Sequence, residues 1–73
     1  MKEIRNRKFR KMMNEAGLGD ILLIQDRGYL YITSDNENSP VFTLKETAFY
    51  VNSFHDMTPE QWVQEIQERL KNE

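Results

Sequence analysis

The stretch 21–34, which reads ILLIQDRGYLYITS, constrains the fold of this chain more than any other. Two runs rich in β-branched and aromatic residues flank a short polar sequence, QDRG. Its glycine, Gly28, stands where a hairpin loop of three to five residues needs a backbone with positive φ. The stretch 21–34 is therefore predicted to form a β-hairpin.

The two runs of the hairpin differ in their pattern of apolar residues. The first run is apolar at four consecutive positions, which indicates a central strand buried on both faces. The second run alternates, with Leu30 and Ile32 on one face and Tyr29 and Tyr31 on the other. We expect the aliphatic pair to face the core of the domain.

Residues 2–16 are predicted to form an amphipathic helix, followed by Gly17 and Leu18, which suit the last two positions of a Schellman ending. Its apolar residues recur at i, i+3, i+4 and i+7, the spacing of a helical stripe. They are Phe9, Met12, Met13 and Ala16.

A second helix is predicted over residues 59–71. Thr58 suits the N-cap, the next residue is a proline, and Gln61 completes a capping box. Met57 and Trp62 occupy the positions of a hydrophobic staple. Solvent-facing positions are assigned to Glu65, Glu68 and Arg69.

The segment 41–53 admits more than one structure. Residues 47–53, TAFYVNS, alternate as a third strand would, with Tyr50 on the opposite face from Phe49. A helix over 45–50 is the alternative. Residues 41–46 form either an extra strand or an apolar plug over one end of the sheet.

These elements predict a single α+β domain spanning residues 1–73, because a chain of this length has room for one core. The order is α-β-β-β-α, with a three-stranded antiparallel meander and both helices on one face. The predicted core comprises Phe9, Leu30, Ile32, Phe49, Trp62 and Ile66.

Four short runs of the chain, MMNEAG, RGYLYI, TAFYVNSF and MTPEQWVQEI, support a resemblance. Together they resemble a family of small phage and prophage proteins that has a Gly-Tyr hairpin and a Thr-Pro-Glu-Gln-Trp helix. The resemblance implies the same order of elements and an origin in a mobile element. The family has no assigned activity, so it implies no catalytic or binding residues.

Charge is unevenly distributed along the chain. Residues 1–11 hold six basic residues against one acidic residue, whereas the remainder holds four basic residues against eleven acidic ones. A basic helix face able to contact phosphates is predicted at Arg7, Lys8, Arg10 and Lys11. The alternative is an ordinary solvated surface, and the net charge of −2 for the whole chain weighs against a nucleic-acid partner.

The tyrosines are the other candidate site. Tyr29 and Tyr31 share a face, and Tyr50 joins them if the third strand pairs as predicted. Such a patch offers a large contact area with polar tips, suited to a partner protein, a second copy of the chain or stacked bases. The alternative is cross-strand pairing that only stiffens the sheet.

No constellation of residues indicates catalysis, a metal or a cofactor. His55, the single histidine, lies in a polar segment before a helix and is expected to be a surface residue. The chain has no cysteine and no run of about 20 apolar residues, so we expect a cytoplasmic protein that does not enter membranes. The predicted role is a non-catalytic accessory module that binds another protein or itself, with nucleic acid as the alternative partner.

Overall fold

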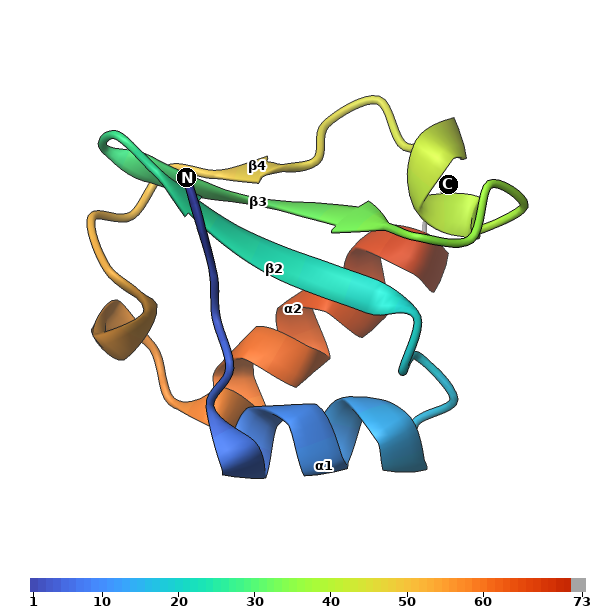
Figure 1. The fold of residues 1–73 in the computed structure, drawn as a ribbon, viewed down its shortest axis with the longest axis horizontal. Helices are drawn as coiled ribbons and strands as arrows, with labels where there is room; N and C mark the ends of the chain where they lie inside the picture. Colours follow the sequence, from blue (N-terminus) through green and yellow to red (C-terminus); the bar gives the residue numbers. More distant parts are fainter. Residues whose placement is uncertain (72–73) are drawn as a thin grey trace.

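A computed structural model describes residues 1–71, which form a four-stranded antiparallel sheet and two α-helices in a small α+β domain. The predicted domain, 1–73, extends two residues beyond the described part. Both helices lie on the same side of the sheet (Figure 1). In chain order the elements are β1 (Lys2–Glu3), α1 (Arg7–Glu15), β2 (Ile21–Asp26), β3 (Tyr29–Ser34), the 3-10 helix η1 (Pro40–Thr43), β4 (Ala48–Phe49), the 3-10 helix η2 (Phe54–Asp56) and α2 (Pro59–Lys71).

The predicted helix over 2–16 is too long at its amino end, and the three-stranded sheet lacks a strand. Residues 2 and 3 form β1, which pairs with Gln25 and Ile24 of β2. The helix starts only after Asn6, whose side chain accepts a hydrogen bond from the backbone N–H of Phe9 at 2.9 Å. Helix-compatible residues thus become a strand, because β2 needs a neighbour for its backbone groups.

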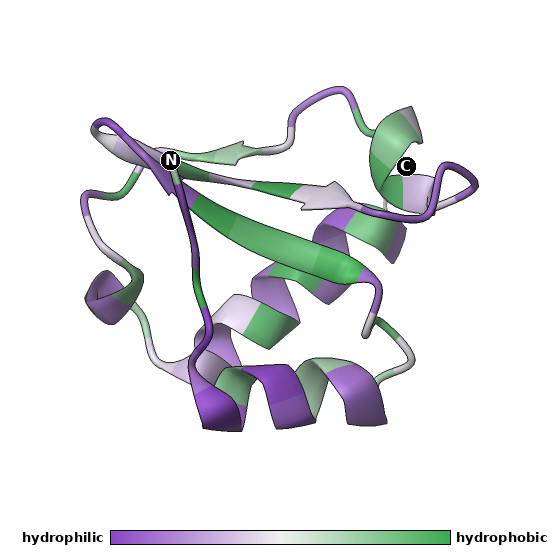
Figure 2. Ribbon diagram, viewed as in Figure 1, coloured by the Kyte–Doolittle hydropathy of each residue, from purple (hydrophilic) through white to green (hydrophobic). Residues whose placement is uncertain are grey.

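The hairpin is confirmed, with a shorter loop than predicted. Asp26 pairs with Tyr29, so only two residues connect the strands, and Gly28 has the expected positive φ of 77°. The strand β2 is central, between β1 and β3. Its predicted burial on both faces is wrong, because Leu22 and Ile24 are only half-buried. Figure 2 shows β2 as an almost continuous hydrophobic strand that ends at a hydrophilic turn.

The third predicted strand, 47–53, exists but is much shorter. Only Ala48 and Phe49 pair with β3, opposite Tyr31 and Leu30. The backbone N–H of Val51 donates to the carbonyl of Phe49 at 2.9 Å, a tight turn that ends the pairing. The alternative helix over 45–50 does not form.

Residues 41–46 provide an apolar plug instead of an extra strand. Pro40 opens η1, which places Val41 in the core at 1% exposure. The hydroxyl of Ser39 accepts a hydrogen bond from the backbone N–H of Val41 at 3.3 Å and so starts this turn. The plug lies at one end of the sheet in Figure 1.

The predicted helix ends are confirmed where their signals are local. Thr58 and Gln61 exchange both bonds of a capping box, with N···O distances of 2.9 and 3.1 Å. At the end of α1, the backbone N–H of Leu18 donates to Met13 at 2.8 Å and that of Gly17 to Asn14 at 3.1 Å. Gly17 has a φ of 76°, which completes the Schellman ending.

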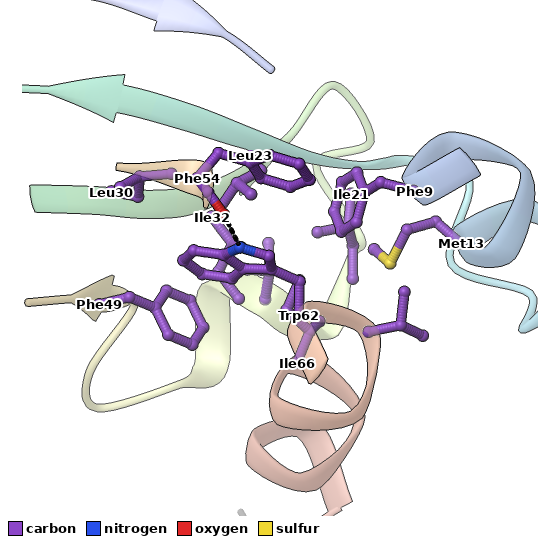
Figure 3. Packing of buried hydrophobic residues seen from close by; sticks show 12 residues of the cluster. Phe9, Met13, Ile21, Leu23, Leu30, Ile32, Phe49, Phe54, Trp62 and Ile66 are labelled. Carbon is purple, nitrogen blue, oxygen red and sulfur yellow. Dashed lines mark hydrogen bonds between the residues drawn. The ribbon is translucent and has the colours of Figure 1, made fainter. Parts of the chain in front are cut away.

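The core is centred on Trp62, which α2 places under the sheet with 0% exposure. The indole Nε1 donates a hydrogen bond to the carbonyl of Phe54 at 2.7 Å (Figure 3). The ring of Phe54 lies parallel to the indole at 5.8 Å, while Phe49 meets it edge-on at 5.1 Å. Phe54 in turn contacts Phe9 edge-to-face at 5.5 Å. All six residues of the predicted core are buried.

Truncation of Trp62 to alanine should destabilise the domain by about 3–5 kcal/mol, because it removes a buried aromatic ring and leaves a cavity. In a chain of this size a loss on that scale is comparable to the whole stability. Urea unfolding followed by circular dichroism measures it, with the exposed Gln64→Ala on the same helix as control. Equal urea midpoints for the two variants would show that Trp62 does not stabilise the core.

Candidate interaction face

One face of the sheet is left without a helix, because α1 and α2 both pack against the other (Figure 1). We call the uncovered side the open face. Cross-strand pairing places Ile24, Tyr31 and Ala48 on the same side of the sheet, and alternation adds Leu22 and Tyr29. The open face is therefore apolar and aromatic at its centre.

Three tyrosines gather on the open face, and we call them the tyrosine cluster. The ring centroid of Tyr29 lies 6.1 Å from that of Tyr31 and 6.3 Å from that of Tyr50. Both pairs are tilted, at 38° and 39°, within the range of interacting aromatic rings. Tyr50 follows β4 and is 76% exposed, whereas the other two are half-buried. The structure brings all three predicted residues together.

The hydroxyl group of each tyrosine in the cluster has a partner. Tyr29 donates to Asp26 Oδ2 at 3.1 Å, and Tyr50 donates to Glu46 Oε2 at 3.3 Å. Tyr31 donates to the thioether sulfur of Met1 at 3.1 Å. These contacts hold the rings in defined orientations with carboxylates at the rim of the cluster.

The contact between Asp26 and Tyr29 shifts the pKa values of both groups. The backbone N–H of Arg27 donates to Asp26 at 2.8 Å and, with the hydroxyl of Tyr29, lowers the pKa of this carboxyl group. The hydrogen bond to Asp26, and then the charge of that carboxylate, raise the pKa of Tyr29. The Arg27 N–H and the Tyr29 hydroxyl both favour the charged form of Asp26, and the bond to that carboxylate favours the neutral form of Tyr29.

The part of the chain that the structure describes, residues 1–71, has no pocket, and its open face is a surface without a cavity.

The four predicted basic residues do not form one free surface. Arg10 is half-buried and its guanidinium donates to the backbone carbonyls of Gly19 at 2.6 Å and Ile21 at 2.7 Å. Lys8 forms an ion pair with Glu60 of α2 at 2.7 Å, which lowers the pKa of that carboxyl group. Arg7 and Lys11 are exposed. Contact of these residues with nucleic acid stays a prediction.

His55 lies exposed in η2, with its ring edge-to-face against Phe54 at 5.7 Å. Within residues 1–71, no three histidine, aspartate or glutamate side chains are grouped so that they could hold a metal ion. None of the helices that the structure describes is long and apolar enough to cross a membrane.

Sequence reasoning missed the carboxylates that hold the cluster. Asp26 and Tyr29 are the two residues that flank the hairpin loop, and Glu46 precedes Tyr50 by four residues. The first pair could have been found from the hairpin alone, because residues that close a two-residue loop face each other. The second pair depends on the turn before β4, which the sequence does not reveal.

Replacing Arg10 with alanine should lower the free energy of unfolding by about 1–3 kcal/mol, because two part-buried carbonyls lose a charged donor. Lys11→Ala, one residue along on the exposed side of α1, should leave stability nearly unchanged. Urea unfolding of the two variants makes the comparison. Equal free energies of unfolding for the two variants would show that the hydrogen bonds of Arg10 do not stabilise the domain.

The phenol of Tyr29 should ionise above its ordinary value of 10.0. Its pKa is raised on folding, so the stabilisation from the bond to Asp26 is present below pH 10 and disappears as the pH rises through the raised pKa. A difference absorbance titration of the wild type against Tyr29→Phe isolates this phenol. Asp26→Asn should move its midpoint back toward the ordinary value, and an unmoved midpoint would contradict the assignment.

No family model, curated protein or solved structure matches this chain. The resemblance to phage proteins therefore stays a prediction, and any function for this domain has to be argued from the geometry of its own residues.

Proposed function

We propose that this domain is a protein-interaction module that associates through the tyrosine cluster, most directly with a second copy of itself. The observation that carries the proposal is the grouping of Tyr29, Tyr31 and Tyr50 on the one sheet face that no helix covers. Tyrosine is enriched at the energetic centres of interfaces because its ring buries a large area while its hydroxyl group can keep a hydrogen-bond partner.

The hydroxyl contacts support the proposal because they reduce the side-chain entropy that is lost on binding. Asp26 and Glu46 already hold the rings of Tyr29 and Tyr50, so a partner has less side-chain freedom to remove on binding. The half-buried Leu22 and Ile24 extend apolar surface beside the cluster. An ordinary interface takes about 800 Å² from each partner, so the contact would need these strand residues as well as the tyrosines.

The wider setting is also a proposal. We propose a non-catalytic accessory protein of phage or mobile-element type, and the support is the sequence resemblance described above. A cytoplasmic location agrees with a chain of 73 residues that contains no cysteine, since reducing compartments make no use of disulfides.

Replacing Tyr29 and Tyr31 together with serine should abolish self-association while the fold survives, because both rings point away from the core. Light scattering at about 0.1 M and about 1 M salt measures the mass, since the screening length falls from roughly 10 Å to roughly 3 Å. The wild-type association should persist at high salt, as expected for an apolar and aromatic contact.

The matched control replaces the same two residues with phenylalanine, which keeps the rings and loses only their hydroxyl contacts, so the association should persist in weakened form. A wild-type chain that is monomeric at both salts would contradict self-association. Nucleic acid then becomes the partner to test, by titration of the wild type against a variant with reversed charge at the exposed Arg7 and Lys11.

A further inference from the structure

The strand β4 lies at the edge of the sheet, and its outward backbone groups are occupied by side chains. The carbonyl of Thr47 accepts from the N–H of Ile32 at 3.1 Å, so the next residue, Ala48, directs its N–H and carbonyl away from β3. The carboxylate of Glu46 accepts the N–H of Ala48 at 3.0 Å. The guanidinium of Arg69 donates to the carbonyl of Ala48 at 2.7 Å.

Arg69 contacts a second backbone carbonyl on the same edge. Its Nη1 also donates to the carbonyl of Glu46 at 3.2 Å, two residues before Ala48 on the same edge. Carbonyls at i and i+2 are the groups that an added strand would contact with its own N–H groups. The arginine that was predicted to face solvent therefore occupies the place of a neighbouring strand, and Glu46 supplies the matching acceptor.

Both side chains are anchored from elsewhere. The guanidinium carbon of Arg69 lies 3.8 Å from the ring centroid of Phe49, a cation–π contact. The second carboxylate oxygen of Glu46 accepts the hydroxyl of Tyr50 at 3.3 Å. We call Arg69 and Glu46 the edge clasp.

The segment under the clasp has the composition of a strand that pairs readily. Residues 47–53, TAFYVNS, contain no charge, no proline and no glycine, and include two aromatic and two β-branched residues. Uncharged segments of this kind are hazards when they lie at a sheet edge, because their unpaired backbone groups accept another chain. The other edge strand, β1, carries two charged residues, which themselves discourage pairing.

We infer that the edge clasp closes β4 against strand addition, and that opening it converts this edge into a pairing site for the same edge of a second copy. A two-fold axis at Ala48 lets each copy donate its N–H to the other's carbonyl, and alanine presents little bulk there. The inference concerns the strand edge and not the tyrosine cluster; Glu46 contacts both, so the test removes association through the cluster.

The test opens the clasp with Arg69→Met and Glu46→Ala in one chain. Methionine keeps an unbranched side chain against Phe49, and the two changes together leave the net charge unaltered. The variant is made in the Tyr29→Ser, Tyr31→Ser background, so association through the tyrosine cluster does not contribute. Light scattering over a concentration series measures mass, and hydrogen exchange measures protection of the Ala48 amide.

The mass of the open-clasp variant should rise about twofold or more with concentration, as copies pair. Protection of the Ala48 amide should rise in parallel. The matched control, Glu65→Ala with Lys71→Met in the same background, removes the same two types of charge from exposed positions on α2. It should show the mass of the background chain at every concentration.

An open-clasp variant that is folded by circular dichroism but keeps the control's mass at every concentration overturns the inference. If that variant does not fold, Glu46→Ala alone is used in the same Tyr29→Ser, Tyr31→Ser background, because it frees the Ala48 N–H and changes only an exposed side chain. Its Ala48 amide should exchange faster than that of the background chain when dilute and more slowly as concentration rises. Exchange that is independent of concentration overturns the inference in that variant.

Discussion

The hydrogen bond between the Trp62 indole and the Phe54 carbonyl is buried at the centre of the core and fixes the position of α2. A buried indole N–H must find an acceptor, and here the acceptor lies in the turn that leads the chain from the sheet into α2. The same ring packs against Phe49 of β4, and Phe54 extends the contact to Phe9 of α1. A chain of 73 residues without a disulfide depends on such core contacts to hold both helices against the sheet.

The parts of the fold that could be predicted are those with local signals. The capping box of Thr58, the Schellman ending at Gly17 and the glycine of the hairpin each act within a few residues. The strand β1 could not be found this way, because its residues become extended only through pairing with Gln25 and Ile24 across the sheet. The early end of β4 likewise follows from a turn that no spacing in the sequence marks.

The residues of the candidate interaction face also differ in whether local signals or long-range pairing determine their positions. Alternation along β3 places Tyr29 and Tyr31 on one side, whereas Tyr50 depends on the pairing of β3 with β4. Charged residues were the least predictable. The helical position of Arg10 indicates solvent, yet its guanidinium reaches the carbonyls of Gly19 and Ile21, because long side chains bridge elements that are distant along the chain.

The contact between Met1 and Tyr31 bears on how the protein is handled. It places the amino end of the chain beside the tyrosine cluster, and the charge of that end contributes to the lowered pKa of Asp26. An affinity tag fused ahead of Met1 would emerge beside the tyrosine cluster and move the charge of the terminal ammonium group away from Asp26. Such a tag would lie beside the same rings through which we propose that the domain associates.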